Sequence, residues 1–247
     1  MDINNYLDST YLKTAEQAGL DFEENKKIVT AFIDEAITNR FKLVMIRPDH
    51  VALAKEMIVQ ARSKLTIGTV IGFPEGTSSL ADKLTEAQKA VDDGADDLDF
   101  VCNYRAFIDG DLETVKAEIL QGTHLGLSHH KIVKWIIETA ALTDKQIIQI
   151  CSMIKNIVLT NFPEEMYQQV FVKSSTGFYR TENNLPNGAT IPAIIMMLEN
   201  ASPLSVKAAG GVRTYDEAVE MIKLGVKRIG TSSAKAIASG QESGSHY

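Results

Sequence analysis

Two lysines stand at the ends of short apolar runs, and each is followed by a loop of small residues. Lys173 ends residues 170–173 (VFVK) before SSTGF, and Lys207 ends residues 204–207 (LSVK) before AAGGVRT. If both ammonium groups face one pocket, the like charge and the loss of water each lower their pKa. At a separation of about 4 to 5 Å, the repulsion is worth roughly 3 to 4 kcal/mol, or about two to three pKa units. One lysine would then hold an uncharged amine, which attacks carbonyl carbons.

A carboxylate interrupts an earlier apolar run. Asp99 lies within residues 98–101 (LDFV). A carboxylate paired tightly with the nucleophilic lysine would bring the pKa of that lysine back towards its ordinary value. We therefore expect Asp99 to face Lys207 or a bridging water, and to carry protons during the reaction.

Glycines and hydroxyl residues follow the last two apolar runs. The pair GG at residues 210–211 comes after the run that ends at Lys207, and GTSS occupies residues 230–233. Small residues let backbone N–H groups approach an anion closely, and hydroxyl groups add further donors. This pattern predicts a phosphate site and therefore a phosphorylated substrate.

The elements that must position these residues alternate along the chain. Short runs rich in β-branched residues are typical of buried parallel strands. We expect them at residues 42–46, 66–72, 98–101, 132–137, 170–173, 204–207 and 227–230, with a weaker strand at residues 6–10. The stretches between them have the periodicity of amphipathic helices. Those helices are expected at residues 81–92, 112–122, 144–157, 190–200 and 215–224.

Eight strand and helix units in a chain of 247 residues predict an α/β protein with a single (β/α)8 TIM-barrel domain. No linker rich in Pro, Gly or Ser divides the chain, so the barrel is expected to span residues 1–240, with residues 241–247 as a flexible tail. A doubly wound open sheet is the alternative architecture. In a barrel, Lys173, Lys207 and Asp99 would meet at the carboxyl ends of the strands, where barrels hold their active sites.

Composition excludes several classes of partner. A formal net charge of -7 argues against nucleic acid as a partner. There is neither a signal peptide nor a long apolar run, so no membrane association is expected. Two cysteines do not form a disulfide framework, which favours a cytoplasmic protein. The histidines lack the spacing of metal ligands, so we expect no metal.

The motifs together resemble one family. They are LDST at residues 7–10, IGFPEG at 71–76, GADDLDFVCNYRAF at 94–107, KWIIET at 134–139, FVKSSTGF at 171–178, VKAAGGVRT at 206–214 and IGTSS at 229–233. In this order and spacing they resemble deoxyribose-phosphate aldolase. The resemblance implies a class I aldolase on a TIM barrel that needs no metal and no organic cofactor. It would reversibly cleave 2-deoxy-D-ribose 5-phosphate to D-glyceraldehyde 3-phosphate and acetaldehyde. It also suggests a homodimer.

The resemblance assigns roles by position. Lys173 resembles the lysine that forms the Schiff base, Lys207 the second lysine that perturbs it, and Asp99 the aspartate of the proton relay. A C-terminal tyrosine covers the active site in some members, so Tyr247 is a candidate proton donor. The residues expected to bind substrate or its phosphate are Asp8, Thr10, Thr176, Gly177, Gly210, Gly211, Gly230, Ser232 and Ser233.

Two other functions fit the same residues. One is a different phosphosugar enzyme on this barrel, such as a transaldolase or an isomerase. An isomerase needs a carboxylate base at a strand end but no lysine pair, so the activities of Lys173→Met and Asp99→Asn separate the two. The other is a non-catalytic barrel that binds phosphosugars and tolerates the loss of Lys173.

Overall fold

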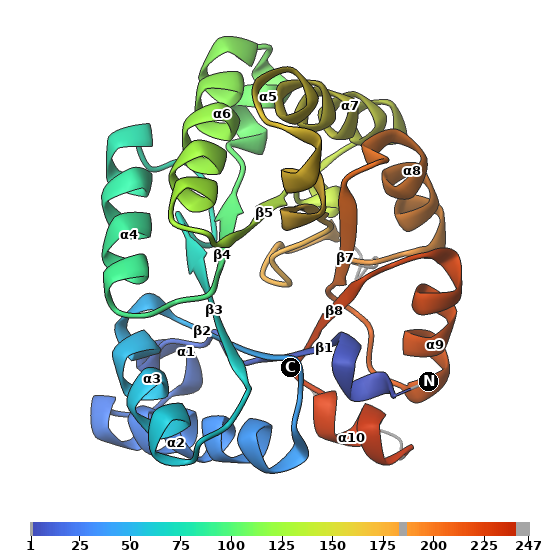
Figure 1. Cartoon of the computed structure of the whole chain (residues 1–247). Helices are drawn as coiled ribbons and strands as arrows, with labels where there is room; N and C mark the ends of the chain where they lie inside the picture. The colour runs from blue at the N-terminus through green and yellow to red at the C-terminus, as the bar shows by residue number, and fades with distance from the viewer. Residues whose placement is uncertain (1, 183–186, 241–247) are drawn as a thin grey trace.

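The computed structural model describes residues 2–182 and 187–240, so the expected tail and Tyr247 lie outside the described residues. Parallel strands close into a barrel in sequence order, because β1 pairs with both β2 and β8 (Figure 1). The strands are β1 (Leu7–Thr10), β2 (Leu43–Ile46), β3 (Thr66–Ile71), β4 (Asp97–Val101), β5 (Ile132–Ile136), β6 (Val170–Lys173), β7 (Ser205–Ala209) and β8 (Arg228–Thr231). The TIM barrel is confirmed and the open sheet is wrong.

Helices surround the barrel and cover the outer face of its strands (Figure 1). They are α1 (Ala15–Ala18), α2 (Phe22–Asn39), α3 (Val51–Gln60), α4 (Leu80–Asp92), α5 (Tyr104–Asp109), α6 (Leu112–Ser128), α7 (Asp144–Asn161), α8 (Ile191–Ala201), α9 (Tyr215–Leu224) and α10 (Ala234–Ser239). Several begin with reciprocal caps between side chain and backbone, such as Thr143 with Gln146 before α7 and Thr214 with Glu217 before α9. These caps satisfy backbone N–H groups that the first turn leaves without a partner. No helix in the described part of the chain is both long and apolar enough to cross a membrane.

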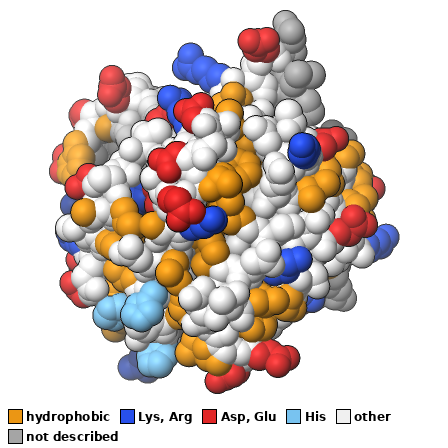
Figure 2. Space-filling model, turned by 90° about the horizontal axis from the view of Figure 1, so that it is seen from above, with side chains coloured by type: hydrophobic (Ala, Val, Ile, Leu, Met, Phe, Trp, Pro, Cys, Tyr) orange, Lys and Arg blue, Asp and Glu red, His pale blue; other side chains and the backbone are white. Residues whose placement is uncertain are grey.

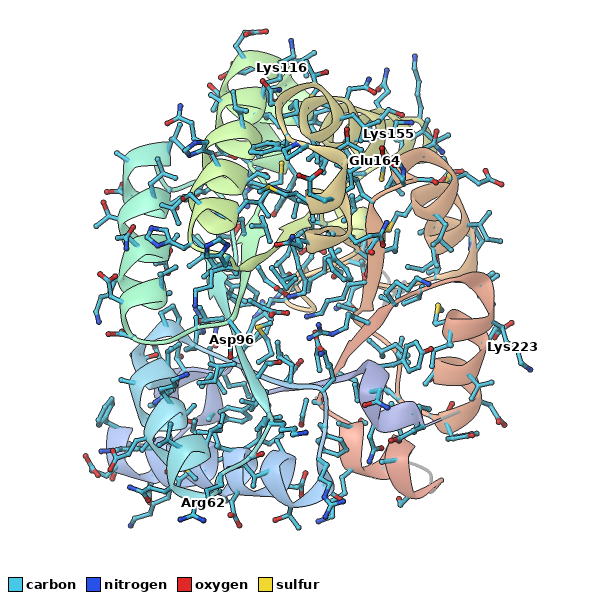
Figure 3. All side chains as sticks on the ribbon, in the orientation of Figure 1. Arg62, Asp96, Lys116, Lys155, Glu164 and Lys223 are labelled. Atoms are coloured by element: carbon cyan, nitrogen blue, oxygen red, sulfur yellow. The ribbon has the colours of Figure 1, made fainter. Side chains whose placement is uncertain are left out.

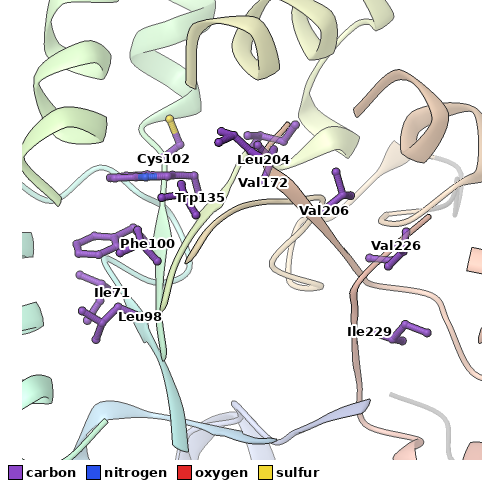
Figure 4. Packing of buried hydrophobic residues seen from close by; sticks show 14 of the residues in the cluster. Ile71, Leu98, Phe100, Cys102, Trp135, Val172, Leu204, Val206, Val226 and Ile229 are labelled. Atoms are coloured by element: carbon purple, nitrogen blue, oxygen red, sulfur yellow. The ribbon is translucent and has the colours of Figure 1, made fainter. Parts of the chain in front are cut away.

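The outward side chains of the strands form the main hydrophobic core with the helices (Figure 4). Phe100 of β4 and Trp135 of β5 stack with their ring centroids 4.9 Å apart. Helix α6 approaches them closely because it carries glycine: a Cβ on Gly122 would lie 2.8 Å from Trp135, and one on Gly126 would lie 2.2 Å from Val133. Helix α6 continues to Ser128, past the expected end at residue 122. Its glycines mark close packing instead of a helix terminus.

The inward side chains of the strands differ sharply from the outward ones. Apolar residues fill one side of the interior, where Leu43 and Met45 of β2 pack with Val70 of β3. Charged residues from the remaining strands fill the rest. They are Asp8, Asp97, Asp99, Lys134, Lys173, Lys207 and Arg228, each 6% exposed or less. Such groups are buried in proteins only when they are paired, so this cluster identifies the part of the molecule that carries chemistry.

Candidate active site

Lys173, the last residue of β6, and Lys207, in the middle of β7, are partners in the register of the two strands. The side chains alternate along each strand, so Val172 and Val206 face the helices while both lysines face the interior. Lys173 is 3% exposed and Lys207 is 0% exposed. The two ammonium groups expected to share a pocket therefore lie in one buried cluster.

Asp99 joins the two lysines. Lys173 Nζ and Lys207 Nζ each donate a hydrogen bond of 2.9 Å to Oδ2 of Asp99. The contact with Lys207 agrees with expectation, but the equally short contact with Lys173 does not. A single carboxylate oxygen can take both bonds because the two lysines are side by side on neighbouring strands and all three side chains point into the same interior.

A third lysine, which sequence reasoning missed, occupies the other oxygen of Asp99. Lys134 of β5 donates to Oδ1 of Asp99 at 2.8 Å and to Oδ2 of Asp97 at 2.6 Å. Its signal in the sequence was a cation in the middle of the apolar run 132–137, at a position that alternates with Val133 and Trp135. Once the run is a barrel strand, this alternation places Lys134 inside the barrel.

Asp8 lies in this cluster and does not line the cavity described below. Its Oδ2 is 2.6 Å from Lys207 Nζ, and its Oδ1 accepts a 2.7 Å hydrogen bond from Nε of Arg228. Arg228 also places Nη2 3.3 Å from Oδ2 of Asp97. The residue expected to bind substrate is thus bonded to the second lysine and to an arginine at the start of β8.

Burial and the carboxylates act differently on the two lysines. The pKa of Lys173 is lowered to about 8. Burial is the largest cause, the charge of Lys207 adds to it, and the attraction of Asp99 opposes both. Burial also lowers the pKa of Lys207, but Asp8 and Asp99 outweigh it and leave the pKa above its ordinary value. Burial thus lowers the pKa of Lys173 more than the charge of Lys207 does, whereas the sequence analysis derived the size of the shift from the repulsion between the two lysines. Lys173 is the weaker base of the pair.

The pKa of Asp99 stays low in the same surroundings. Burial alone would raise it, but Lys134, Lys173 and Lys207 hold it well below its ordinary value. Asp99 is therefore an ionised proton acceptor at neutral pH. The lysines around Asp99 lie inside the barrel, whereas Lys116, Lys155 and Lys223 lie on the surrounding helices (Figure 3). The interior charges act at short range in a space with little water to screen them.

A cavity of about 340 Å³ opens above this cluster, at the carboxyl ends of β1, β6, β7 and β8. Most of the residues expected to bind substrate line it. They are Thr10, Thr176, Gly177, Gly210, Gly211, Gly230 and Ser232, and Lys173 lines the cavity with them. Ser233 is not among the lining residues, and its backbone N–H donates to Oγ1 of Thr231 at 3.0 Å. Sequence reasoning missed Arg180 and Arg213, which bring positive charge to the same cavity.

Buried hydrogen bonds shape the loop after β6. Glu138, which follows β5 in the left-handed region with φ 56°, accepts hydrogen bonds from Ser175 Oγ at 2.7 Å and from the backbone N–H of Thr176 at 3.1 Å. Ser174 Oγ donates to the carbonyl of Ala209 at 2.8 Å and accepts from its N–H at 2.9 Å. The loop that follows Lys173 is therefore hydrogen-bonded to Glu138 after β5 and to Ala209 of β7. Burial raises the pKa of Glu138.

The chain is similar to known proteins over nearly its whole length. No protein-family model matches the chain. A deoxyribose-phosphate aldolase of Thermococcus gammatolerans is 38% identical over 241 residues, which cover 97% of this chain and 96% of the relative. One of Streptococcus gordonii is 34% identical over 248 residues and covers 100% of both chains.

Solved structures agree in fold. An aldolase named QR15 has a TM-score of 0.80 at 30% identity, with 97% of this chain and 95% of that chain covered. The deoxyribose phosphate aldolase of Aeropyrum pernix, described as a unique tetrameric structure, has a TM-score of 0.75 at 27% identity over 96% of this chain and 89% of that chain. Because the likeness to these enzymes runs through nearly every strand and loop that builds the lysine cluster, the chain belongs to the deoxyribose-phosphate aldolase family.

Proposed function

We propose that this chain reversibly cleaves 2-deoxy-D-ribose 5-phosphate to D-glyceraldehyde 3-phosphate and acetaldehyde through a Schiff base on Lys173. The observation that carries this proposal is a buried lysine with a pKa of about 8 that lines a cavity also lined by glycines and arginines. At pH 7 about a tenth of its amine is uncharged, a far larger share than for an ordinary lysine. The names of the relatives support the choice of substrate.

Lys173 reacts with the aldehyde carbon C1 of the open-chain sugar. The free amine adds to C1, the C1 oxygen leaves as water after protonation, and an iminium ion remains. A general base then takes the proton of the C3 hydroxyl, and the bond between C2 and C3 breaks. Its electron pair moves into the iminium to give an enamine on C1 and C2, and C3 to C5 leave as glyceraldehyde 3-phosphate. Protonation of C2 and hydrolysis release acetaldehyde and the free lysine.

Asp99 and Lys207 are suited to move these protons. Asp99 is an ionised carboxylate in contact with the reacting nitrogen, and Lys207 is an ammonium bonded to the same oxygen. Acting through water, the pair can accept a proton at one step and return it at the next. Asp8 has a supporting part in this proposal, because it helps to keep Lys207 charged.

Other residues that line the cavity suit the phosphate. Gly210 and Gly211 both have φ of 86°, a conformation that favours glycine and brings the backbone close to a ligand. Arg180, Arg213 and Ser232 add cations and a hydroxyl to the lining. Binding of the phosphate there would fix the aldehyde at Lys173, and such remote contacts lower a barrier by several kcal/mol.

Two measurements on one set of variants test this function. Wild type incubated with deoxyribose 5-phosphate should release acetaldehyde, and addition of borohydride should leave a reduced adduct on Lys173 that peptide mass analysis locates. Lys173→Leu should lose both the release and the adduct. Lys116→Leu, at an exposed lysine, is the matched control and should keep both. An adduct on another lysine, or full activity of Lys173→Leu, would reject the proposal.

We also infer a homodimer. The chain has a surface groove lined by Leu84, Leu120, Leu125 and Phe162, between α4, α6 and the end of α7. Figure 2 shows hydrophobic side chains running in a band across the molecule as seen from above Figure 1, where α6 and α7 lie. Light scattering coupled to size-exclusion chromatography measures the mass in solution, and twice the chain mass of 27.1 kDa is expected.

The cysteines support a cytoplasmic location for the protein. Cys102 and Cys151 are free and buried. Burial raises the pKa of Cys151 to about 12 and that of Cys102 above its ordinary value, so neither thiol is a ready nucleophile. Cell fractionation with an antibody to the native protein tests the location.

A further inference from the structure

Arg228 belongs to the charged cluster but does not line the substrate cavity. It is the first residue of β8, and Gly230, two positions later on the same strand, does line the cavity. The guanidinium is buried, with 6% of the residue exposed. Its contacts are with carboxylates: Nε and Nη2 lie 2.7 and 2.6 Å from Oδ1 of Asp8, and Nη2 lies 3.3 Å from Asp97. Nothing in the proposed reaction uses it directly.

The position of Arg228 determines which oxygen of Asp8 is left for Lys207. Two nitrogens of the guanidinium approach Oδ1, and Lys207 Nζ lies 2.6 Å from Oδ2. A guanidinium is a planar fork with fixed donor directions, so it orients the carboxylate as well as attracting it. Arg228 thereby holds Asp8 in the place where it keeps Lys207 charged.

The charges of the cluster do not balance when every group is ionised. Among the buried groups joined by ion pairs, three carboxylates, Asp8, Asp97 and Asp99, face the four cations Lys134, Lys173, Lys207 and Arg228. Glu138 is outside this set, because it accepts hydrogen bonds from Ser175 and Thr176 and burial raises its pKa. Burial of an excess cation is costly, so the cluster favours the loss of one proton. Arg228 does not release one, because a guanidinium keeps its charge in proteins. The proton must come from a lysine.

The ion pairs decide which lysine loses it. Lys134 lies within 2.8 Å of two carboxylates, Asp97 and Asp99. Lys207 lies within 2.9 Å of two, Asp8 and Asp99. In the part of the chain that the structure describes, Lys173 forms an ion pair with one carboxylate, Asp99, at 2.9 Å.

The charged groups that act on Lys173 are Asp99 from β4, Lys134 from β5, Glu138 from the turn after β5 and Lys207 from β7. Asp97 and Asp8 contact Lys134 and Lys207 in turn, and Arg228 from β8 contacts both of these carboxylates. We propose that Arg228 is a positioning residue whose permanent charge holds Asp8 against Lys207 and makes Lys173 the amine that gives up its proton. This inference rests on the proposed function, since it explains how the Schiff-base lysine is prepared.

The test is the pH dependence of Lys173 reactivity in full-length variants. Acetaldehyde is added at a series of pH values, borohydride traps the imine, and the initial rate of adduct formation on Lys173 gives a midpoint. In Arg228→Met, three carboxylates face three lysines, so the charges of the cluster balance while Lys173 keeps its proton. The pH midpoint of Lys173 reactivity should therefore rise. A rise of one unit lowers the rate at neutral pH about tenfold. Arg228→Lys keeps the charge but lacks the planar fork, so its midpoint should lie between those of wild type and Arg228→Met.

A double variant separates charge from packing and also serves if Arg228→Met does not fold. Asp8→Asn combined with Arg228→Met removes one carboxylate and one cation, so an excess cation remains and the midpoint should return towards that of wild type. Equal midpoints in Arg228→Met and wild type would overturn the inference, and so would a raised midpoint in the double variant. If wild type itself forms no adduct on Lys173, the proposed function has failed, which is a different result.

Discussion

Lys173 and Lys207 are register partners on β6 and β7, and their ammonium nitrogens each lie 2.9 Å from the same oxygen of Asp99. They nevertheless have opposite pKa shifts, because Lys207 has a second carboxylate in Asp8 and Lys173 does not. Two identical side chains thus gain different roles from a difference of one neighbour. The predictions below follow from this asymmetry and from the packing that supports it.

Asp99→Asn should separate imine formation from cleavage. Asp99 attracts the Lys173 proton, so its loss lowers the pKa of Lys173 further and leaves more free amine at pH 7. Trapping of acetaldehyde by borohydride should be no slower than in wild type. Cleavage of deoxyribose 5-phosphate should fall by about 10²- to 10⁴-fold, because the proton carrier is missing. The exposed Asp109→Asn is the control, and an equal loss of trapping and cleavage would contradict this role of Asp99.

Lys173→Met should stabilise the fold at neutral pH. In the unfolded chain Lys173 keeps its proton up to an ordinary pKa of 10.5, but the folded protein releases it near 8. The unfolded state therefore binds more protons between these values, and the contribution of Lys173 to stability rises with pH across that window. Below pH 8 the variant should gain up to about 3 kcal/mol over wild type. Urea unfolding from pH 7 to 10.5 should show this gain shrinking.

Lys207→Met is the matched variant for that experiment and should have the opposite sign. The folded pKa of Lys207 is raised, so its charge stabilises the fold at every pH below its ordinary pKa. Its removal should lower the free energy of unfolding at pH 7. If both variants shift stability in the same direction, the two lysines do not differ as described.

Gly126→Ala should destabilise the barrel without touching the site. The new Cβ would lie 2.2 Å from a methyl carbon of Val133, so α6 would have to move away from β5. Overpacking of this kind costs about 1 to 3 kcal/mol, more than the gain of up to about 1 kcal/mol from helix propensity. Urea unfolding should show a lower midpoint at an unchanged slope. Gln121→Ala, at an exposed position of the same helix, should stay within about 0.5 kcal/mol of wild type.

Lys83→Met should unfold the protein more readily than the double variant Lys83→Met, Glu118→Leu. Lys83 and Glu118 form a buried ion pair of 2.8 Å between α4 and α6. Removal of the cation alone leaves a buried carboxylate without its partner, which costs about 3 to 5 kcal/mol. Removal of both charges avoids that cost. Equal unfolding midpoints for the single and double variants would show that the pair itself contributes little.

The barrel could be predicted because the strands are short, apolar and evenly spaced, but several boundaries could not. The expected strand at residues 204–207 in fact runs over Ser205–Ala209, and α7 extends to Asn161 instead of residue 157. At such ends, side-chain pattern is weaker than the hydrogen bonds made with neighbouring elements. Tertiary contacts therefore decide the last turns of helices and strands.

The positions of the two lysines could be predicted for a similar reason. Lys173 and Lys207 end their runs before small-residue loops, a position that stands out in any sequence. Lys134 and Arg228 were missed because each lies within a run, where a long cationic side chain is typical of a surface position. Their partners Asp97 and Asp8 lie on other strands, and the stagger of the closed barrel brings them together. That stagger cannot be read from any one run.

The bond between Asp8 and Arg228 joins β1 to β8 across a sequence separation of 220 residues. The first strand leaves the ribosome long before the eighth, so this seam can close only after β8 has been made. Until the barrel closes, Lys173 lacks the burial that lowers its pKa, and its amine stays mostly protonated at neutral pH.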